Sequence, residues 1–246
     1  MNIQIDDDFF KFWKGAVVFQ EDYFEIKYRL EFDKSKTVVF VTDPPYNQDF
    51  IYDQYNDNLS AGDYISLLSG IPSPRVIIHY PEETINILPK AFEGEYCNDV
   101  LTWVYNGNLL KHSRSISFWG LNPDYEYVRQ PPKNPKDKRV IKSMENTGLV
   151  GVRSYDWFNI PQVKGNSKEK TDHPCQIPVK VFDNIIKMIV KDKPEDYIIV
   201  DPFSGSGSCA IACLNNNVNF LGFELSPKYT EIANNRIMQI TGRFVG

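Results

Sequence analysis

The sequence has little of what marks secreted, membrane or metal-binding proteins. Its 246 residues include four cysteines and no CxxC pair, so neither a disulfide framework nor a common zinc motif is indicated. Cys209 and Cys213 have no histidine or carboxylate at ligand spacing, and we expect them to be small buried apolar side chains. No apolar run approaches the roughly 20 residues that cross a bilayer. The acidic start at residues 1–8 lacks the apolar core of a secretory signal, so we expect a cytoplasmic protein without a metal site.

Basic residues are concentrated in one segment of an otherwise acidic chain. The net charge of -5 argues against a protein that coats nucleic acid by charge alone. Between residues 129 and 142, however, six basic residues and one acid give a local charge of +5. These six are Arg129, Lys133, Lys136, Lys138, Arg139 and Lys142. Local charge of this kind is what contacts to phosphates require.

Strand and helix patterns alternate along most of the chain. Short β-branched or aromatic runs predict strands at residues 37–42, 75–79, 99–105, 115–119, 197–201 and 218–223. Amphipathic patterns predict helices at residues 81–92, 179–190, 206–215 and 227–239. This alternation predicts a mainly parallel sheet covered on both faces. Residues 121–170 have weak periodicity and read as a functional loop region or a small inserted subdomain.

A glycine-rich turn follows the predicted strand at residues 197–201. The turn reads Asp201, Pro202, Phe203, Ser204, Gly205, Ser206, Gly207. A turn of this kind, at the carboxyl end of a central strand, is where α/β sheets bind ligands. The glycines would let the backbone approach a ligand without Cβ contacts. Glu224, at the end of the next strand, can accept hydrogen bonds from ribose hydroxyls.

The same turn fits the GxGxxA form of a dinucleotide fingerprint through Gly205, Gly207 and Ala210. Two features favour S-adenosylmethionine over NAD. Asp201 precedes the glycines, which suits a cationic or amine-bearing ligand better than a pyrophosphate. The 22 residues after Glu224 are also too few for the rest of a dinucleotide fold. A tight turn without a ligand is the remaining interpretation.

A rigid corner follows the predicted strand at residues 37–42. It consists of Asp43, Pro44, Pro45 and Tyr46, and its prolines prevent continuation as a helix or a sheet ladder. Asp43 and the Pro44 carbonyl can accept the two N–H groups of an exocyclic amine, while Tyr46 can stack on the base. The amine lone pair would then be free to attack a methyl sulfonium, with the rate supplied by orientation and electrostatics. The alternative is a prolyl turn before a loop.

Together these motifs resemble a known family, the circularly permuted β group of DNA amino-methyltransferases. The corner Asp43-Pro44-Pro45-Tyr46 resembles the family's catalytic motif, and the glycine turn its methionine-binding loop. Residues 223–229, which include Glu224 and Leu225, resemble its ribose-binding segment. The order, with the catalytic motif first and the cofactor loop last, is the most telling feature, because related enzymes for RNA or protein amides usually place the glycine loop first.

Two further segments are similar to cofactor-binding motifs of that family. His173, Pro174, Cys175 and Gln176 belong to a segment that resembles the motif closing over the amino-acid end of the cofactor. Residues 20–25 resemble, more loosely, an N-terminal segment whose aspartate, here Asp22, meets the adenine of S-adenosylmethionine.

The resemblance implies a fold and a DNA-binding region. We expect one catalytic domain over residues 1–246, with a Rossmann-like, doubly wound, mostly parallel α/β sheet of seven strands. The segment at about residues 121–170 would be an inserted target-recognition region. We expect DNA phosphates to contact Arg129, Lys133, Lys138, Arg139 and Lys142, with a solvated loop as the alternative. The resemblance also allows a homodimer and a cognate restriction enzyme.

The sequence departs from the family at two places. Cys175 and Ile177 stand where the family has a hydroxyl-bearing residue and a lysine, so the affinity for S-adenosylmethionine can differ from that of the family. Residues 113–119 lack the family's frequent His-Glu before Trp119, in a region that helps to shape the base pocket.

The expected activity is methylation of adenine N6, since the family's cytosine members more often begin the tetrapeptide with serine rather than an aspartate such as Asp43. The base would have to be flipped out of the duplex, with Phe118, Trp119 and Trp157 as candidates for the wall opposite Tyr46. Two alternatives remain: methylation of cytosine N4, and a catalytically silent nucleic-acid-binding subunit that keeps the fold.

Overall fold

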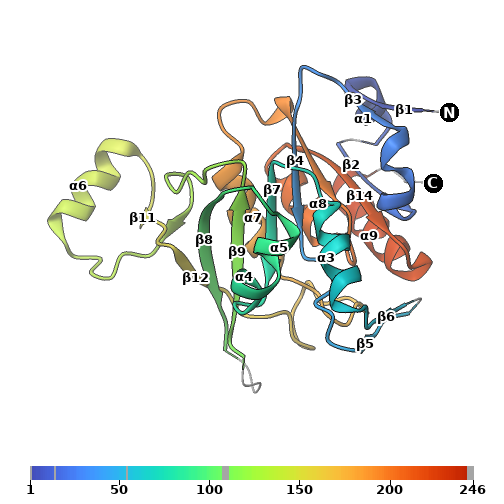
Figure 1. Cartoon of the computed structure of the whole chain (residues 1–246). Coiled ribbons are helices and arrows are strands. Elements are labelled where there is room, and N and C mark those ends of the chain that lie inside the picture. The colour runs from blue at the N-terminus through green and yellow to red at the C-terminus, as the bar shows by residue number, and fades with distance from the viewer. Residues whose placement is uncertain (1, 14, 54, 107–110, 243–246) are drawn as a thin grey trace.

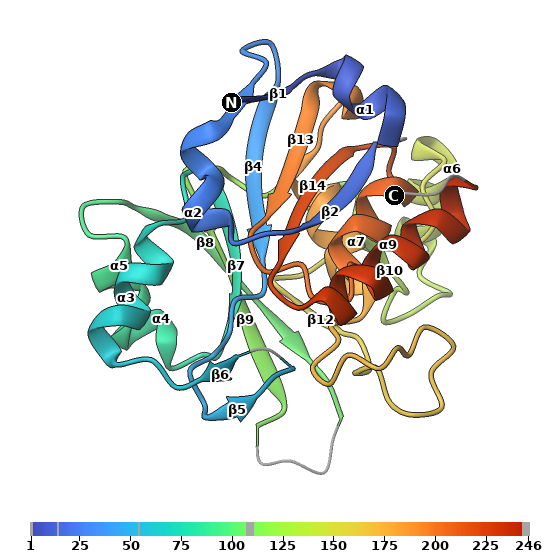
Figure 2. The same cartoon turned by 90° about the vertical axis from the view of Figure 1, so that its right-hand side faces the viewer.

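A mostly parallel sheet with helices on both faces forms the body of the molecule (Figures 1 and 2). The computed structural model describes residues 2–13, 15–53, 55–106 and 111–242. Within them the central sheet has eight strands in the order β12-β8-β9-β7-β4-β13-β14-β2. These strands are β2 (Ala16–Gln20), β4 (Thr37–Thr42), β7 (Arg75–His79), β8 (Cys97–Val104), β9 (Ser113–Trp119), β12 (Trp157–Asn159), β13 (Tyr197–Asp201) and β14 (Asn219–Glu224). The expected Rossmann-like α/β fold is confirmed, with one strand more than the seven expected.

The extra strand is β12, which comes from the segment expected to be an insertion. It pairs in parallel with β8 and extends the edge of the sheet. β9 alone among these eight strands runs antiparallel to its neighbours, β7 and β8. The remaining pairs are parallel, as expected for apolar strands that are buried on both faces.

Apart from α6, the described helices divide between the two faces of the sheet. They are α1 (Asp7–Trp13), α2 (Tyr23–Ile26), α3 (Ala61–Ser69), α4 (Glu83–Asn86), α5 (Leu88–Ala91), α6 (Lys138–Thr147), α7 (Val179–Ile189), α8 (Ser208–Asn215) and α9 (Pro227–Thr241), with 3-10 turns η1 (Lys27–Arg29) and η2 (Pro194–Asp196). Along β4, Val39 and Val41 join the hydrophobic cluster that includes α7, α8 and α9. Phe40, which points the opposite way, joins the cluster beneath α1, α2, α3 and α5. This alternation is the period-two pattern of a strand covered on both sides.

The predicted helix at residues 81–92 is two short helices, α4 and α5, that meet at Ile87. Pro89 lies in the first turn of α5 and has no N–H to donate to the carbonyl four residues earlier. A proline at that position interrupts one continuous helix but is tolerated in the first turn of the next.

The weakly periodic region also contains more regular structure than its sequence predicts. α6 begins at the N-cap Asp137, whose side chain accepts from Arg139 N, and ends at Gly148 in the left-handed conformation. Two short strands, β10 (Arg129–Gln130) and β11 (Val152–Arg153), pair at its base. Figure 1 shows α6 standing clear of the sheet, beyond the edge that β8 and β12 form.

Two more small pairings lie outside the central sheet: β1 (Ile3–Ile5) with β3 (Leu30–Phe32), and β5 (Phe50–Ile51) with β6 (Asn56–Asp57). The second pair is a hairpin that follows the Asp-Pro-Pro-Tyr corner and is labelled in Figure 2. Across the described residues, no helix is both long and apolar enough to span a membrane.

Candidate active site

Three adjoining parallel strands end at the same edge of the sheet and bring the sequence motifs together. β13 lies between β4 and β14, so the corner after β4, the glycine turn after β13 and Glu224 at the end of β14 are neighbours. One pocket is lined by both Tyr46 and Gly205. The prolyl corner and the glycine turn therefore face a common cleft, as the sequence predicts.

The cleft has a polar part and an apolar part. The polar pocket is lined by Asp43, Pro44, Pro45, Tyr46, Tyr52, Tyr55, His173, Cys175, Gln176, Ile177, Phe182, Asp201, Phe203, Ser204, Gly205, Ser206, Ser208 and Glu224. The adjoining pocket is lined by Glu21, Asp22, Tyr23, Phe24, Pro45, Tyr55, Asn56, Asp57, Leu59, Leu67, Pro202, Phe203, Glu224 and Leu225. Four residues line both: Pro45, Tyr55, Phe203 and Glu224. The cleft thus suits a ligand with a charged end and a flat apolar end.

Three carboxylates give the polar pocket its charge. Burial raises the pKa of Asp201 to about 7, and the nearby Asp43 and Glu224 act in the same direction. Hydrogen bonds from Thr42 Oγ1 (2.6 Å) and Phe203 N (3.0 Å) to Asp201 Oδ1 oppose that shift. Because buried like charges destabilise one another, the pocket favours a cationic ligand. The sulfonium and ammonium groups of S-adenosylmethionine fit this requirement.

Glu224 is held in a fixed orientation by the turn it faces. Its Oε2 accepts from Gly205 N at 2.9 Å and its Oε1 from Ser226 N at 2.8 Å. Burial nevertheless raises the pKa of Glu224. Each carboxylate oxygen can accept a second hydrogen bond, so Glu224 keeps the capacity to bind two ribose hydroxyls.

The Asp43–Tyr46 corner is stiffened by its own side chains and by β9. The Tyr46 hydroxyl donates to Asp43 Oδ1. Burial raises the pKa of Asp43 to about 7, while the Tyr46 hydrogen bond and the charge of Arg114 lower it. The Tyr46 ring lies 4.8 Å from the Tyr80 ring, and the Arg114 guanidinium is 5.0 Å from the centre of Tyr46. The corner therefore presents an acceptor and an aromatic ring in a defined relation.

The structure gives a second reason for glycine at both positions of the turn, besides the expected close approach to a ligand. A Cβ on Gly205 would lie 2.9 Å from His173 Nε2, and a Cβ on Gly207 would lie 2.9 Å from the Cβ of Ala233 in α9. Both glycines also have positive φ, +49° and +74°. They permit a left-handed turn that packs tightly against protein segments, rather than only a close approach to a ligand.

The segment that begins at His173 closes one side of the cleft. His173 is buried, stands edge-on to Tyr229 at 4.5 Å, and has a pKa lowered to about 4 by burial, so its ring is neutral at pH 7. Gln176 is also buried and lines the pocket. Cys175 lines the pocket as well, although it is exposed. Pro174 is exposed and is not among the residues that line the pocket.

Asp22 lies at the apolar end, where it is also the N-cap of α2. Its Oδ1 accepts from Phe24 N at 2.8 Å. Pro202 and Leu225 line the same end, and the rings of Phe24 and Phe203 lie 5.8 Å apart. The position of Asp22 is thus compatible with a contact to adenine.

The predicted DNA-binding residues lie elsewhere, on and beside α6. Lys133, Lys138, Arg139 and Lys142 are exposed. Arg129 is mostly buried, with 17% of its side chain exposed, and it donates to Glu126 and to the Gly151 carbonyl. Its guanidinium therefore helps to hold the base of the α6 region together.

Several residues near the corner were not singled out in the sequence. Tyr52 and Tyr55, on either side of the β5–β6 turn, stack at 4.8 Å and line the polar pocket; the aromatic cluster soon after the corner was an available signal. Tyr80 and Arg114 flank Tyr46 only because of the sheet order. By contrast, Phe118 and Trp119 are buried in the core and cannot form the wall expected of them, whereas Trp157 is 45% exposed on β12.

Among the described residues, no group of three or more His, Cys, Asp or Glu side chains is placed to hold a metal ion.

Comparison with known proteins gives a consistent family. The N6_N4_Mtase family model, described as DNA methylase, matches residues 38–235. The type II methyltransferase M.HpaI of Haemophilus parainfluenzae is 24% identical over 235 residues, 86% of this chain and 71% of that protein. M.ScaI of Streptomyces caespitosus is 33% identical over 119 residues, which cover 46% of this chain and 38% of that protein.

Solved structures agree in fold. The M1.HpyAVI complex with SAM has a TM-score of 0.55 at 24% identity, covering 89% of this chain and 98% of that one. The PvuII cytosine-N4-specific DNA methyltransferase has a TM-score of 0.60 at 14% identity, covering 92% and 91%. With the family match and a cleft that suits a cationic nucleoside, S-adenosylmethionine is the cofactor. The chain belongs to the DNA methylase family of N6/N4 amino-methyltransferases.

Proposed function

We propose that this protein methylates adenine N6 of a flipped base in DNA. The observation that carries the proposal is the position of Asp43, a carboxylate rather than a serine hydroxyl, in the same pocket as the glycine turn. A carboxylate is the stronger acceptor for an amine that becomes positively charged as it is methylated. The family's preference for serine in cytosine enzymes, stated above as part of the resemblance, supports the same choice.

The residues of the corner would act on the amine directly. Asp43 accepts one N–H, the Pro44 carbonyl accepts the other, and Tyr46 stacks on the base. S-adenosylmethionine, when bound, supplies the electrophilic methyl group. Preorganised acceptors of this kind stabilise developing charge without reorganising during the reaction. Arg114 and Tyr80 hold the Tyr46 ring in place by their contacts with it.

The target amine lies inside a duplex, so the base must leave the stack. Unstacking costs a few kcal/mol, and stacking on an aromatic ring offsets about 1–3 kcal/mol of it. In this proposal Tyr46 provides that ring.

DNA would reach the protein through the region around α6. Lys133, Lys138, Arg139 and Lys142 are exposed and can reach phosphates, which position the duplex without reading its sequence. Arg129 is the weakest of the five candidates, because its guanidinium is mostly buried and already donates to Glu126 and Gly151. Arg139 also donates, to Asp137, but its side chain is 91% exposed.

The test is to map methylated bases in DNA from cells that express the protein. We expect N6-methyladenine at a defined short sequence, and no such mark with the Asp43→Ala variant. N4-methylcytosine in place of N6-methyladenine would contradict the choice of base while leaving the family intact. A protein that binds labelled S-adenosylmethionine on filters but leaves no mark would instead be the silent subunit.

A further inference from the structure

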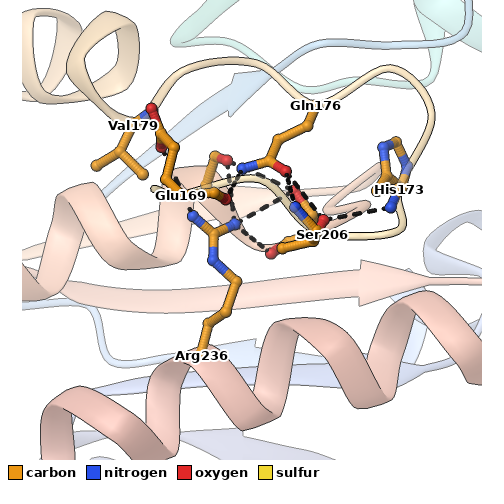
Figure 3. Close-up of polar contacts among 8 residues, drawn as sticks. Glu169, His173, Gln176, Val179, Ser206 and Arg236 are labelled. Carbon is orange, nitrogen blue, oxygen red and sulfur yellow. Dashed lines mark hydrogen bonds and ion pairs between the residues drawn. The ribbon is translucent and has the colours of Figure 1, made fainter. Parts of the chain in front are cut away.

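A mostly buried arginine donates hydrogen bonds to the glycine turn without lining the polar pocket. Arg236, on α9, donates through Nη1 to the Ser206 carbonyl (2.6 Å), to Ser206 Oγ (3.3 Å) and to Ser208 Oγ (3.2 Å). Figure 3 shows its guanidinium between this turn and the segment that carries His173. Only 13% of the side chain is exposed. Ser206 and Ser208 line the polar pocket, whereas Arg236 is not among its lining residues.

The same guanidinium holds the opposite wall of that pocket. Arg236 Nη2 lies 3.8 Å from Glu169 Oε2, and Glu169 Oε2 also accepts from Val179 N at the start of α7 (3.1 Å). The Glu169 carbonyl accepts from Gln176 Nε2 at 2.7 Å. The segment of residues 169–179 is thus held at Glu169 and carries His173 and Gln176, which line the pocket (Figure 3).

The charge near Arg236 is opposite in sign to the charge near Asp43, Asp201 and Glu224. Asp43, Asp201 and Glu224 make the catalytic side negative, which suits the sulfonium and the ammonium of the cofactor. The carboxylate of the cofactor needs the opposite environment. At the turn, Arg236 is a buried cation whose ion pair with Glu169 is long, at 3.8 Å, and Ile177 supplies no charge where the family has a lysine.

We propose that Arg236 is a positioning residue for the amino-acid end of S-adenosylmethionine. It acts through Ser206, Ser208 and Glu169, which it holds in place, and through its positive charge near the ligand carboxylate. This inference rests on the cofactor-binding role of the glycine turn in the proposed function, and is independent of which base is methylated.

Three ligands separate this role from general stabilisation of the fold. S-adenosylmethionine and S-adenosylhomocysteine carry the amino-acid end, whereas 5′-methylthioadenosine keeps the adenosine and the sulfur but lacks it. Calorimetry with Arg236→Gln should show at least about tenfold weaker binding of the first two, as expected for lost charge-assisted hydrogen bonds. Binding of 5′-methylthioadenosine should match the unmodified protein.

Turnover gives an independent readout. For Arg236→Gln, KM for S-adenosylmethionine should rise at least tenfold while kcat at saturating cofactor stays within about twofold, because the corner at Asp43 is untouched. Arg236→Lys, which keeps the charge but loses the planar fork, should recover part of the lost affinity. If Arg236→Gln does not fold, Arg236→Lys is used in its place. Arg29→Gln, an exposed arginine, is the matched control and should change neither quantity.

Equal weakening of all three ligands would overturn the proposal, since it would show a structural role only. Unchanged binding of S-adenosylmethionine would overturn it as well. If the unmodified protein bound none of the three ligands, the proposed function itself would fail, which is a distinguishable result.

Discussion

At the scale of single residues, the proposed methyl transfer depends on one carboxylate, that of Asp43. Replacing Asp43 by alanine removes the acceptor for the amine, and we expect methyl transfer to fall by about 10²–10³-fold or more. Affinity for S-adenosylmethionine should stay within severalfold, because Glu224, Asp201 and the glycine turn remain. Labelled-methyl transfer to DNA measures the first quantity and calorimetry the second. Near-normal turnover would show that the mechanism assigned to the corner is wrong.

The same carboxylate predicts a pH dependence. Burial raises the pKa of Asp43 from its ordinary value to about 7, and the ionised carboxylate is the stronger acceptor for an amine that becomes positively charged. Activity should therefore be lost as the pH falls through about 7 and should level off above about 8. The measurement is kcat/KM for DNA between pH 5.5 and 8.5 at saturating cofactor, a range chosen around that pKa. A flat profile across pH 7 would contradict the role of an ionised Asp43.

Site residues that belong to a recognisable sequence motif could be predicted from the sequence. Site residues that reach the cleft only through the order of the strands could not. Asp43 and Tyr46 follow a recognisable strand, Asp201 and Glu224 end one, and all four line the cleft. Arg114 has no motif of its own. It comes to face Tyr46 because β9 lies antiparallel beside β7, a pairing that the periodicity of neither strand specifies.

At the scale of elements, strong apolar runs located the strands well. The structure reproduces the predicted limits of β4, β7 and β13, and shifts those of β14 by one residue. The helix α6 was missed because it is exposed along its length, with no fully buried residue. Polar and charged residues dominate its sequence, so only Val140, Ile141 and Met144 mark an apolar face, too few to distinguish this helix from a loop.

The α6 helix gives a prediction about DNA. Changing Lys138 and Lys142 together to alanine should weaken DNA binding and reduce the slope of log K against log salt by about 1.8, because each lost phosphate contact removes about 0.9. Cofactor affinity should not change. Changing Lys180 and Lys187 in α7, which bond Asp183, is the matched control. If the α6 variant and the α7 variant changed DNA affinity and its salt dependence equally, α6 would not be the element that contacts DNA.

The junction between α8 and α9 gives a prediction about stability. Gly207→Ala should lower the free energy of unfolding by about 1–3 kcal/mol, because its Cβ would meet Ala233 and its φ is +74°. Gly94 has a φ of +81° but open space around its Cβ position, so Gly94→Ala carries the backbone strain alone. Urea unfolding measures both, and an equal loss in the two variants would show that the contact with Ala233 contributes nothing.

At the scale of the whole molecule, the site exists because the sheet joins the two ends of the chain. Thr42 and Asp201, 159 residues apart, share a hydrogen bond of 2.6 Å in the floor of the cleft. The predicted parallel sheet is consistent with this meeting, since parallel strands end at one edge. The position of α6 relative to the cleft was not indicated, because it depends on the packing of β12 against β8.

In the proposed reaction, the Asp43–Tyr46 corner and the glycine turn act together to transfer a methyl group to adenine N6. The most direct measurement incubates the purified protein with labelled S-adenosylmethionine and duplex DNA, digests the DNA to nucleosides and separates them. We expect the label in N6-methyl-2′-deoxyadenosine. Label in N4-methylcytosine, or DNA that stays unlabelled while the protein binds the cofactor, would contradict it.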